Sequence, residues 1–192
     1  MGARVIFHEL LTPEEALSRI LSYVDVRPLG VEVVGLEDAY GRVLAEDVYS
    51  PVDVPPFDRS IVDGYAVRAE DLFGVDELNP GELRVVGSVK PGDSTLPRVG
   101  VGEAVEISTG APIPPGSNAV VMVEYTKSIG DRVIVYRSVV PGENIVSAGS
   151  DIALGELVLR RCTRLGEREI GVLAAIGLRE VRVYRRPRVA VI

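Results

Sequence analysis

The sequence is poor in the side chains that most often build metal sites and catalytic relays. Its 192 residues include one cysteine, Cys162, one histidine, His8, and no tryptophan. One cysteine cannot form an internal disulfide or a cysteine-based zinc site. One histidine leaves almost no room for a Ser-His-Asp relay or a multi-histidine metal site. We expect Cys162 to be a small buried apolar residue, and catalysis to rest on carboxylates, hydroxyls, backbone amides or a cofactor.

Long apolar runs and an excess of positive charge are also missing. No run approaches the roughly 20 apolar residues of a membrane-spanning helix, and the N-terminus lacks the apolar stretch of a signal peptide. We therefore expect a cytoplasmic protein with no membrane segment. The net charge of −7, from 28 acidic and 21 basic residues, disfavours nucleic acid as a partner. A small anion is compatible with this charge, since loop amides or a helix N-terminus can bind it locally.

Helical patterns occur near both ends of the chain. Thr12-Pro13-Glu14-Glu15 predicts a helix start, with Thr12 as the N-cap and Glu15 completing a capping box. A second helix is predicted over residues 167–176 and ends at Gly177. Short strands are predicted at residues 31–34, 157–159 and 181–184, with a turn of helix near 37–40 and extended chain over 42–48.

Between about Pro51 and Pro141, prolines and glycines separate short alternating strands. The clearest strands are residues 83–87, 103–107, 119–123 and 132–136, and this spacing favours a barrel or a sandwich. The order of patterns along the chain predicts a mixed α+β fold. A discontinuous α/β first domain, residues 1–51 and 140–184, would carry an inserted β-rich, barrel-like domain, residues 52–139.

The final residues form an unbroken apolar run, Val189-Ala190-Val191-Ile192. Such a run is typical of a strand that is buried on both faces of a parallel sheet. A buried strand needs neighbours on both sides, so we expect residues 185–192 to be the first strand of a further α/β domain that lies beyond this sequence. A free edge strand or a frayed tail is the alternative.

Three segments carry groups that are suited to chemistry. In residues 55–67, two prolines hold the chain extended before Ser60, Asp63 and Gly64. Gly64 lets the backbone come close to a ligand or another chain, and a carboxylate beside a hydroxyl can hold a metal, orient water or bind an oxyanion. Equally, the segment could be an ordinary proline-rich loop in which Asp63 caps a turn.

The second segment, residues 108–119, begins Ser108-Thr109-Gly110 and presents two hydroxyls next to a flexible amide. It lacks the lysine and the glycine spacing of a P-loop, and a rigid turn is the alternative reading. In the third segment, residues 141–152, Asp151 follows a small, flexible run and could reach into a cleft. Alternatively, Asp151 caps the next turn of a linker.

Together, in this order and spacing, the segments resemble one family, the molybdopterin molybdotransferases, which include MoeA and the E domain of gephyrin. The resemblance covers nearly the whole chain. It includes Glu37–Val48, Pro55–Val67, Ser108–Glu124, Pro141–Asp151, Gly166–Tyr184 and Arg186–Ile192.

The resemblance implies an elongated homodimer whose third, α/β domain binds the pterin and whose fourth domain is a β-barrel. It places the active-site cleft between the second domain of one subunit and the third domain of its partner. Asp63 and Thr109 match positions that line this cleft, and Asp151 matches a further functional aspartate. Because the pterin-binding domain is missing, we expect this part of the protein alone to be inactive.

The reaction implied is insertion of molybdate into adenylylated molybdopterin with release of AMP, assisted by Mg²⁺. By residue type, Thr109 and nearby backbone amides would donate hydrogen bonds to phosphate or molybdate oxygens. Asp63 would hold the hydrated cation or position water. Ser60, Gly64, Ser108 and Gly110 are expected to contact substrate. This interpretation requires Asp63 and Thr109 to face the same groove.

The sequence departs from the family pattern at two places. Val62 replaces the methionine that commonly precedes Asp-Gly-Tyr-Ala, which is a swap of similar volume. Val146, Ser147 and Ala148 occupy positions where family members often carry arginines, and losing these cations weakens the attraction for an anion. Three alternatives therefore stay open: a tungstate-handling paralogue, a dimeric scaffold of the same fold that binds a partner protein, and an unrelated β-rich binding module.

Overall fold

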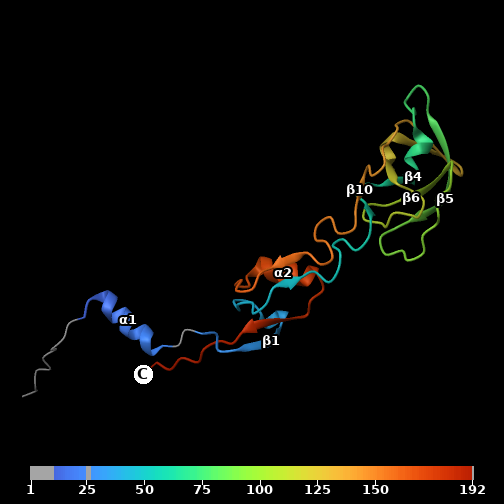
Figure 1. The fold of residues 1–192 in the computed structure, drawn as a ribbon. Coiled ribbons are helices and arrows are strands. Elements are labelled where there is room, and N and C mark those ends of the chain that lie inside the picture. Colours follow the sequence, from blue (N-terminus) through green and yellow to red (C-terminus); the bar gives the residue numbers. More distant parts are fainter. Residues whose placement is uncertain (1–10, 25–26, 192) are drawn as a thin grey trace, which may run out of the picture.

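The protein is elongated, with two bodies joined by paired chain segments (Figure 1). The computed structural model describes residues 11–24 and 27–191, so His8 lies outside the described residues. In chain order the elements are α1 (Pro13–Tyr23), β1 (Val31–Gly35), η1 (Leu36–Asp38), β2 (Val48–Tyr49), β3 (Arg59–Ser60), β4 (Gly64–Val67), η2 (Ala69–Leu72), β5 (Gly81–Val89), β6 (Glu103–Ile107), β7 (Ala119–Met122), η3 (Val123–Tyr125), β8 (Thr126–Ile129), β9 (Arg132–Val135), β10 (Ile145–Val146), β11 (Leu157–Leu159), α2 (Glu167–Ala175) and β12 (Glu180–Tyr184).

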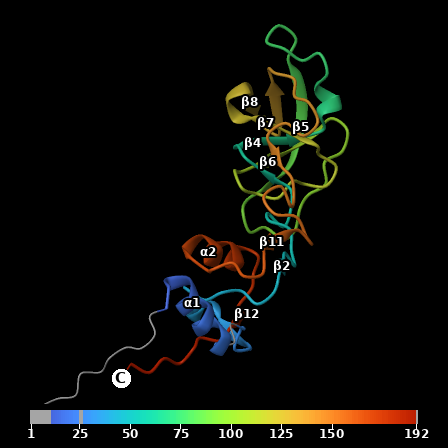
Figure 2. The same ribbon diagram turned by 60° about the vertical axis from the view of Figure 1, so that its left-hand side comes forward.

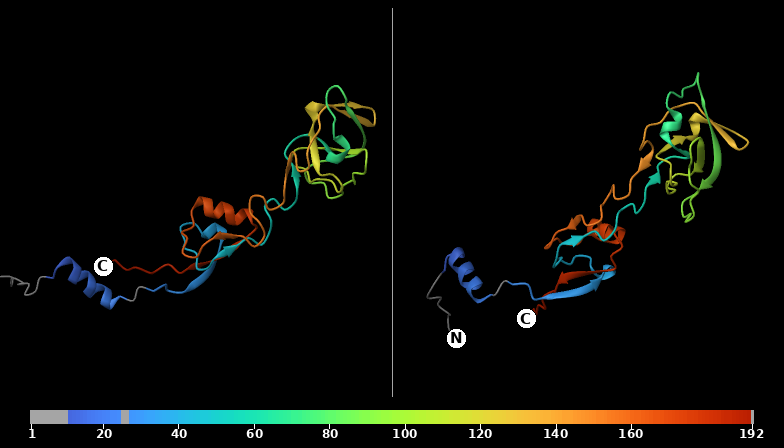
Figure 3. Two further views of the ribbon diagram at one scale, coloured as in Figure 1. Left: turned by 45° about the horizontal axis from the view of Figure 1, so that its top comes forward. Right: turned by 45° about the vertical axis from the view of Figure 1, so that its right-hand side comes forward.

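Helix α1 begins where its capping signals predict. The Thr12 hydroxyl accepts a hydrogen bond from the backbone N–H of Glu15 at 3.3 Å, and the Glu15 carboxylate accepts one from the Thr12 N–H at 2.9 Å. The predicted capping box is therefore confirmed. None of the helix residues is buried, and Figures 1 and 3 show α1 apart from both bodies. Local interactions must therefore carry most of its stability.

The first body combines two small antiparallel sheets, β1–β12 and β11–β2, with helix α2. Its apolar core draws on residues from both ends of the chain, namely Ala39, Leu44, Val48, Leu165, Leu173, Ile176, Val181 and Val183. Helix α2 ends as predicted, with Gly177 in the left-handed region at φ 81°. Two segments far apart in sequence thus share one core.

The second body is a six-stranded sheet in the order β7-β4-β6-β5-β9-β8 (Figure 2). Strands β5 and β6 are parallel and the other pairs are antiparallel. Apolar side chains pack on both faces of the sheet, one cluster around Val121 and Val133 and another around Val105 and Val120. The expected mixed α+β fold with a β-rich insertion is therefore confirmed.

Two antiparallel segments, residues 48–61 and 144–159, run side by side between the bodies, and we call them the neck (Figures 1 and 3). Their backbones are joined along most of this length. The N–H of Ser50 donates to the Glu156 carbonyl at 2.9 Å, and the N–H of Gly149 donates to the Pro55 carbonyl at 2.9 Å. At its upper end, β10 pairs with β3. The neck connects the third sequence segment to the first.

Two expectations differ from the structure. Cys162 is exposed, not buried, because it lies in a turn with a left-handed backbone, at φ 68°, that directs its side chain outward. Residues 185–191 form no strand, and Val189 and Val191 are 79% and 95% exposed. The described residues offer no strand for this segment to pair with, so the further α/β domain stays a prediction. In the described part of the chain, no helix combines the length and the apolar character needed to cross a membrane.

Candidate functional site

The structure brings the first and second sequence segments into direct contact. The backbone N–H of Thr109 donates to the Asp63 carboxylate (Oδ1) at 2.8 Å, although the two residues are 46 positions apart. Both side chains are exposed. The contact uses the amide of Thr109, so the Thr109 hydroxyl and the second oxygen of Asp63 form no hydrogen bond with any described residue. One carboxylate oxygen and one hydroxyl are thus available to a ligand at the same place.

A tight turn before β4 fixes the position of Asp63. The hydroxyl of Ser60 donates to the Val62 carbonyl at 2.6 Å and accepts from the Val62 N–H at 3.2 Å. The carbonyl of Asp63 accepts a hydrogen bond from the Val123 N–H at 3.0 Å. Ser60 is only 1% exposed, so its hydroxyl shapes the turn and is not presented to a substrate.

Gly64 allows a close approach, but to another strand of the sheet. A Cβ atom at Gly64 would lie 1.8 Å from the carbonyl oxygen of Val121 in β7. Gly64 is buried, and its pairing with β7 anchors the residue next to Asp63. The expected contact of Gly64 with substrate therefore has no surface on which to occur.

The loop at residues 108–111 uses its own amides to hold its shape. The N–H groups of Ser108, Gly110 and Ala111 donate to the carbonyls of Val89, Ser60 and Ser108 at 3.1, 2.8 and 3.0 Å. With the Thr109 amide on Asp63, all four N–H groups have partners. This corrects the expectation that the amides would bind an oxyanion, because each N–H donates only one hydrogen. What the loop presents is the hydroxyl groups of Ser108 and Thr109.

Asp151 lies in the neck and not beside Asp63. Its N–H donates to the Val54 carbonyl at 2.9 Å, and Val54 precedes Asp63 by nine residues. No hydrogen bond among the described residues joins Asp151 to Asp63 or Thr109. The carboxylate of Asp151 is exposed, so it can act on the same ligand only if that ligand is large or a further part of the protein reaches it.

Sequence reasoning missed two further aspartates that organise this region. Asp58 accepts a hydrogen bond from the Ala148 N–H at 2.8 Å, and Asp53 accepts one from the Leu154 N–H at 2.8 Å. Asp53, Asp58 and Asp63 are spaced by five residues, and each accepts an N–H from a distant loop. The regular spacing was visible in the sequence, but the partner loops were not.

The comparisons with known proteins agree on one family. The sequence model described as the MoeA N-terminal region (domain I and II) matches residues 11–177. This chain belongs to the MoeA N-terminal family. A molybdopterin molybdenumtransferase of Staphylococcus epidermidis is 36% identical over 183 residues, which are 95% of this chain and 43% of that protein. Its Staphylococcus aureus counterpart (strain MRSA252) is 37% identical over 179 residues, 93% of this chain and 42% of that one.

A solved structure shows the same fold. The molybdopterin biosynthesis MoeA protein of Pyrococcus horikoshii superposes with a TM-score of 0.84 at 41% identity, over 93% of this chain and 45% of that one. The chain therefore spans less than half the length of these MoeA relatives.

Among the positions that depart from the family pattern, Val146 lies directly opposite Arg59 in the β10–β3 pair. Ala148 is held by Asp58, and Ser147 is exposed. The strand that lacks the expected basic residues thus runs beside a strand that carries one.

A divalent cation fits this part of the MoeA chain only as a shared ion. The described residues contain no group of three or more metal-ligating side chains. Asp63 offers one free carboxylate oxygen, since its other oxygen accepts the Thr109 N–H. Mg²⁺ commonly takes one or two protein carboxylates and completes its octahedron with water and substrate phosphates. Asp63 is therefore a suitable single ligand, with the remaining ligands from outside this chain.

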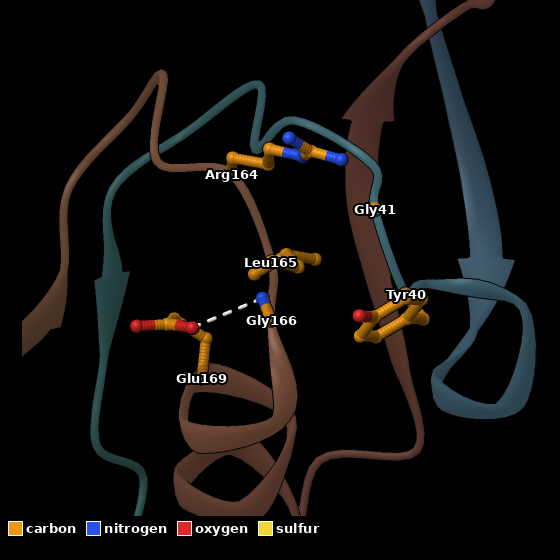
Figure 4. A pocket seen from close by; sticks show the side chains of 6 residues that line it. All are labelled: Tyr40, Gly41, Arg164, Leu165, Gly166 and Glu169. Carbon is orange, nitrogen blue, oxygen red and sulfur yellow. Dashed lines mark hydrogen bonds between the residues drawn. The ribbon is translucent and has the colours of Figure 1, made fainter.

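The first body of this MoeA chain has a separate shallow pocket of about 280 Å³, lined by Tyr40, Gly41, Arg164, Leu165, Gly166 and Glu169 (Figure 4). Its polar groups largely satisfy one another. The Tyr40 hydroxyl donates to Glu167 at 3.0 Å, which raises the pKa of Tyr40. The Gly166 N–H donates to Glu169 at 2.9 Å. The pocket draws only on residues 40–41 and 164–169, so it is distinct from the Asp63–Thr109 contact.

Proposed function

We propose that this chain forms one wall of an active site that inserts molybdate into adenylylated molybdopterin with release of AMP. The observation that supports this most directly is the contact between Asp63 and Thr109, which places a free carboxylate oxygen beside exposed hydroxyls. Relatives named molybdopterin molybdenumtransferase support the same reaction. Because the chain spans less than half of these relatives, the activity belongs to a longer protein, which we propose to be a cytoplasmic homodimer.

The hydroxyls of Ser108 and Thr109 would donate hydrogen bonds to phosphate or molybdate oxygens. The loop that carries them is fixed by its own amides, so little conformational entropy would be lost on binding. Asp63 would orient a water molecule or hold a hydrated Mg²⁺. When bound, Mg²⁺ would reduce the repulsion between the two anionic substrates. The amide of Thr109 contributes indirectly, because it fixes the orientation of the Asp63 carboxylate.

The test is in vitro cofactor maturation with the full-length protein. The substitution Asp63→Asn keeps an oxygen that can accept the Thr109 N–H but removes the charge. We expect kcat/KM for AMP release to fall by about 10²-fold or more, in the range found when one preorganised electrostatic group is lost. Thermal unfolding should be unchanged.

Asp76 provides a matched control. Its carboxylate also accepts backbone N–H groups, from Leu78 and Asn79 at 2.9 and 2.8 Å, in an exposed loop of the same body. Asp76→Asn should leave kcat/KM unchanged. If Asp63→Asn and Asp76→Asn are equally active, Asp63 has no part in the reaction.

A further inference from the structure

Arg59 occupies the strand that lies between the two loops of the candidate site. In β3, Arg59 is directly opposite Val146 on one side, and it forms a β-bridge with Pro112 on the other. The next residue, Ser60, exchanges backbone hydrogen bonds with Gly110 and Ala111 at 2.8 and 3.0 Å. Pro112 follows Thr109 by three residues, so an extended chain places Arg59 roughly 10 Å along the strand from the level of Thr109.

The side chain of Arg59 is on the open side of this strand. Exposure alternates along the segment: Arg59, Ile61 and Asp63 are exposed, whereas Ser60 and Gly64 are buried. In extended chain, residues two apart point to the same face. The guanidinium group therefore shares the exposed side of the segment with the Asp63 carboxylate.

Arg59 also differs from its neighbours in having no charged partner. Four other arginines of the second body form ion pairs with carboxylates, namely Arg68, Arg84, Arg132 and Arg137. Arg59 makes no hydrogen bond or ion pair with any described residue. The adjacent carboxylate, Asp58, accepts the Ala148 N–H instead, and the cross-strand neighbours Val146 and Pro112 are uncharged.

We propose that Arg59 binds an oxyanion of the substrate, a phosphate or molybdate oxygen, next to the hydroxyl of Thr109. This inference rests on the proposed function. An anion that approaches Asp63 and Asp58 in a chain of net charge −7 is repelled unless a cation offsets the carboxylates. A guanidinium group presents several N–H donors in a planar fork that matches the oxygens of phosphate-like anions. Arg59 is exposed and unpaired, so it can bind without first breaking an ion pair.

The experiment uses the full-length protein and compares Arg59→Gln with Lys127→Gln. Lys127 is an exposed cation in β8, which is separated from β4 by four strand spacings, roughly 19 Å along the sheet. Initial rates of AMP release are measured against molybdate and against adenylylated molybdopterin at two salt concentrations. We expect Arg59→Gln to raise the KM of at least one substrate about tenfold, as for loss of a charged hydrogen bond.

Three further results complete the test. The kcat of Arg59→Gln should change little, and its KM should depend less on salt than that of the wild type. Arg59→Lys should lie between the two, because it keeps the charge but loses the fork. Lys127→Gln should match the wild type.

Two results would overturn the role of Arg59 and leave the proposed function intact. One is an unchanged KM in Arg59→Gln while Asp63→Asn loses activity. The other is a raised KM in Lys90→Gln but not in Arg59→Gln, because Lys90 is the other cation close to the 108–111 loop. A wild-type protein that releases no AMP would instead overturn the proposed function, and the inference with it.

Discussion

Replacing Gly64 with alanine tests whether this glycine serves packing or substrate binding. The added Cβ atom would lie 1.8 Å from the Val121 carbonyl oxygen, where an ordinary contact needs at least 3.4 Å. Strands β4 and β7 would have to separate by about 1.6 Å at this point. Both neighbours in the clash are backbone atoms of a buried strand, so no side chain can rotate to relieve it.

The cost can be worked from the groups that the separation affects. Gly64 pairs with Met122, and the carbonyl of Asp63 accepts the Val123 N–H at 3.0 Å. Overpacking costs about 1–3 kcal/mol, and each buried backbone group left without a partner adds about 1–3 kcal/mol. We therefore expect Gly64→Ala to lower the free energy of unfolding of the sheet by about 3 kcal/mol or more. That is a large part of the roughly 5–15 kcal/mol available to a domain.

The assay is urea denaturation followed by circular dichroism, with amide exchange to locate the effect in β4 and β7. Gly171 in α2 is the control, because a Cβ atom there would have no heavy atom within 4 Å. Gly171→Ala should stabilise α2 by about 0.5–1 kcal/mol. The same chemical change thus has opposite signs at the two sites. A loss below about 1 kcal/mol in Gly64→Ala would refute the packing argument.

Two further predictions concern local interactions. Thr12→Ala removes the N-cap of α1 at a cost of about 1 kcal/mol, so amide exchange in this helix should accelerate about fivefold, and an unchanged rate would show that the cap is unimportant. Glu167→Gln should return the pKa of Tyr40 toward its ordinary value, because the Glu167 carboxylate raises that pKa. The contribution of the wild-type Tyr40–Glu167 contact is complete below the ordinary tyrosine pKa and is lost as pH rises through the raised one. The Tyr40 ring carbon shift, followed by NMR from pH 8 to 12, checks this, and identical titrations in the two proteins would contradict it.

Local signals in the sequence predicted the elements whose stability depends on neighbours in the chain. The capping box at Thr12 and the terminal Gly177 were both predicted, as were strands β5, β6, β7 and β9 from their alternating pattern. Strand β4 was missed, because all four of its residues are buried. Such a strand shows no alternation, and it follows a proline-rich motif that also resembles a loop.

Of the candidate site, the residue types could be predicted but their use could not. Asp63 and Thr109 were selected from their motifs, whereas the hydrogen bond between them depends on the pairing of β4 with β6, 46 residues apart. The amides of the 108–111 loop were expected to face a ligand, yet strand contacts occupy them. Ser60 and Gly64 were expected to bind substrate, yet both are buried.

By itself, the sequence determined the family, the absence of cysteine and histidine chemistry, and the order of most strands and helices. These properties depend on residue types and short spacings. Only the tertiary structure decided which groups stay free for a ligand. A donor or acceptor is free when no distant segment has bound it, and only the fold brings distant segments together. That is why the second oxygen of Asp63 and the guanidinium of Arg59 were recognised as available only from the structure.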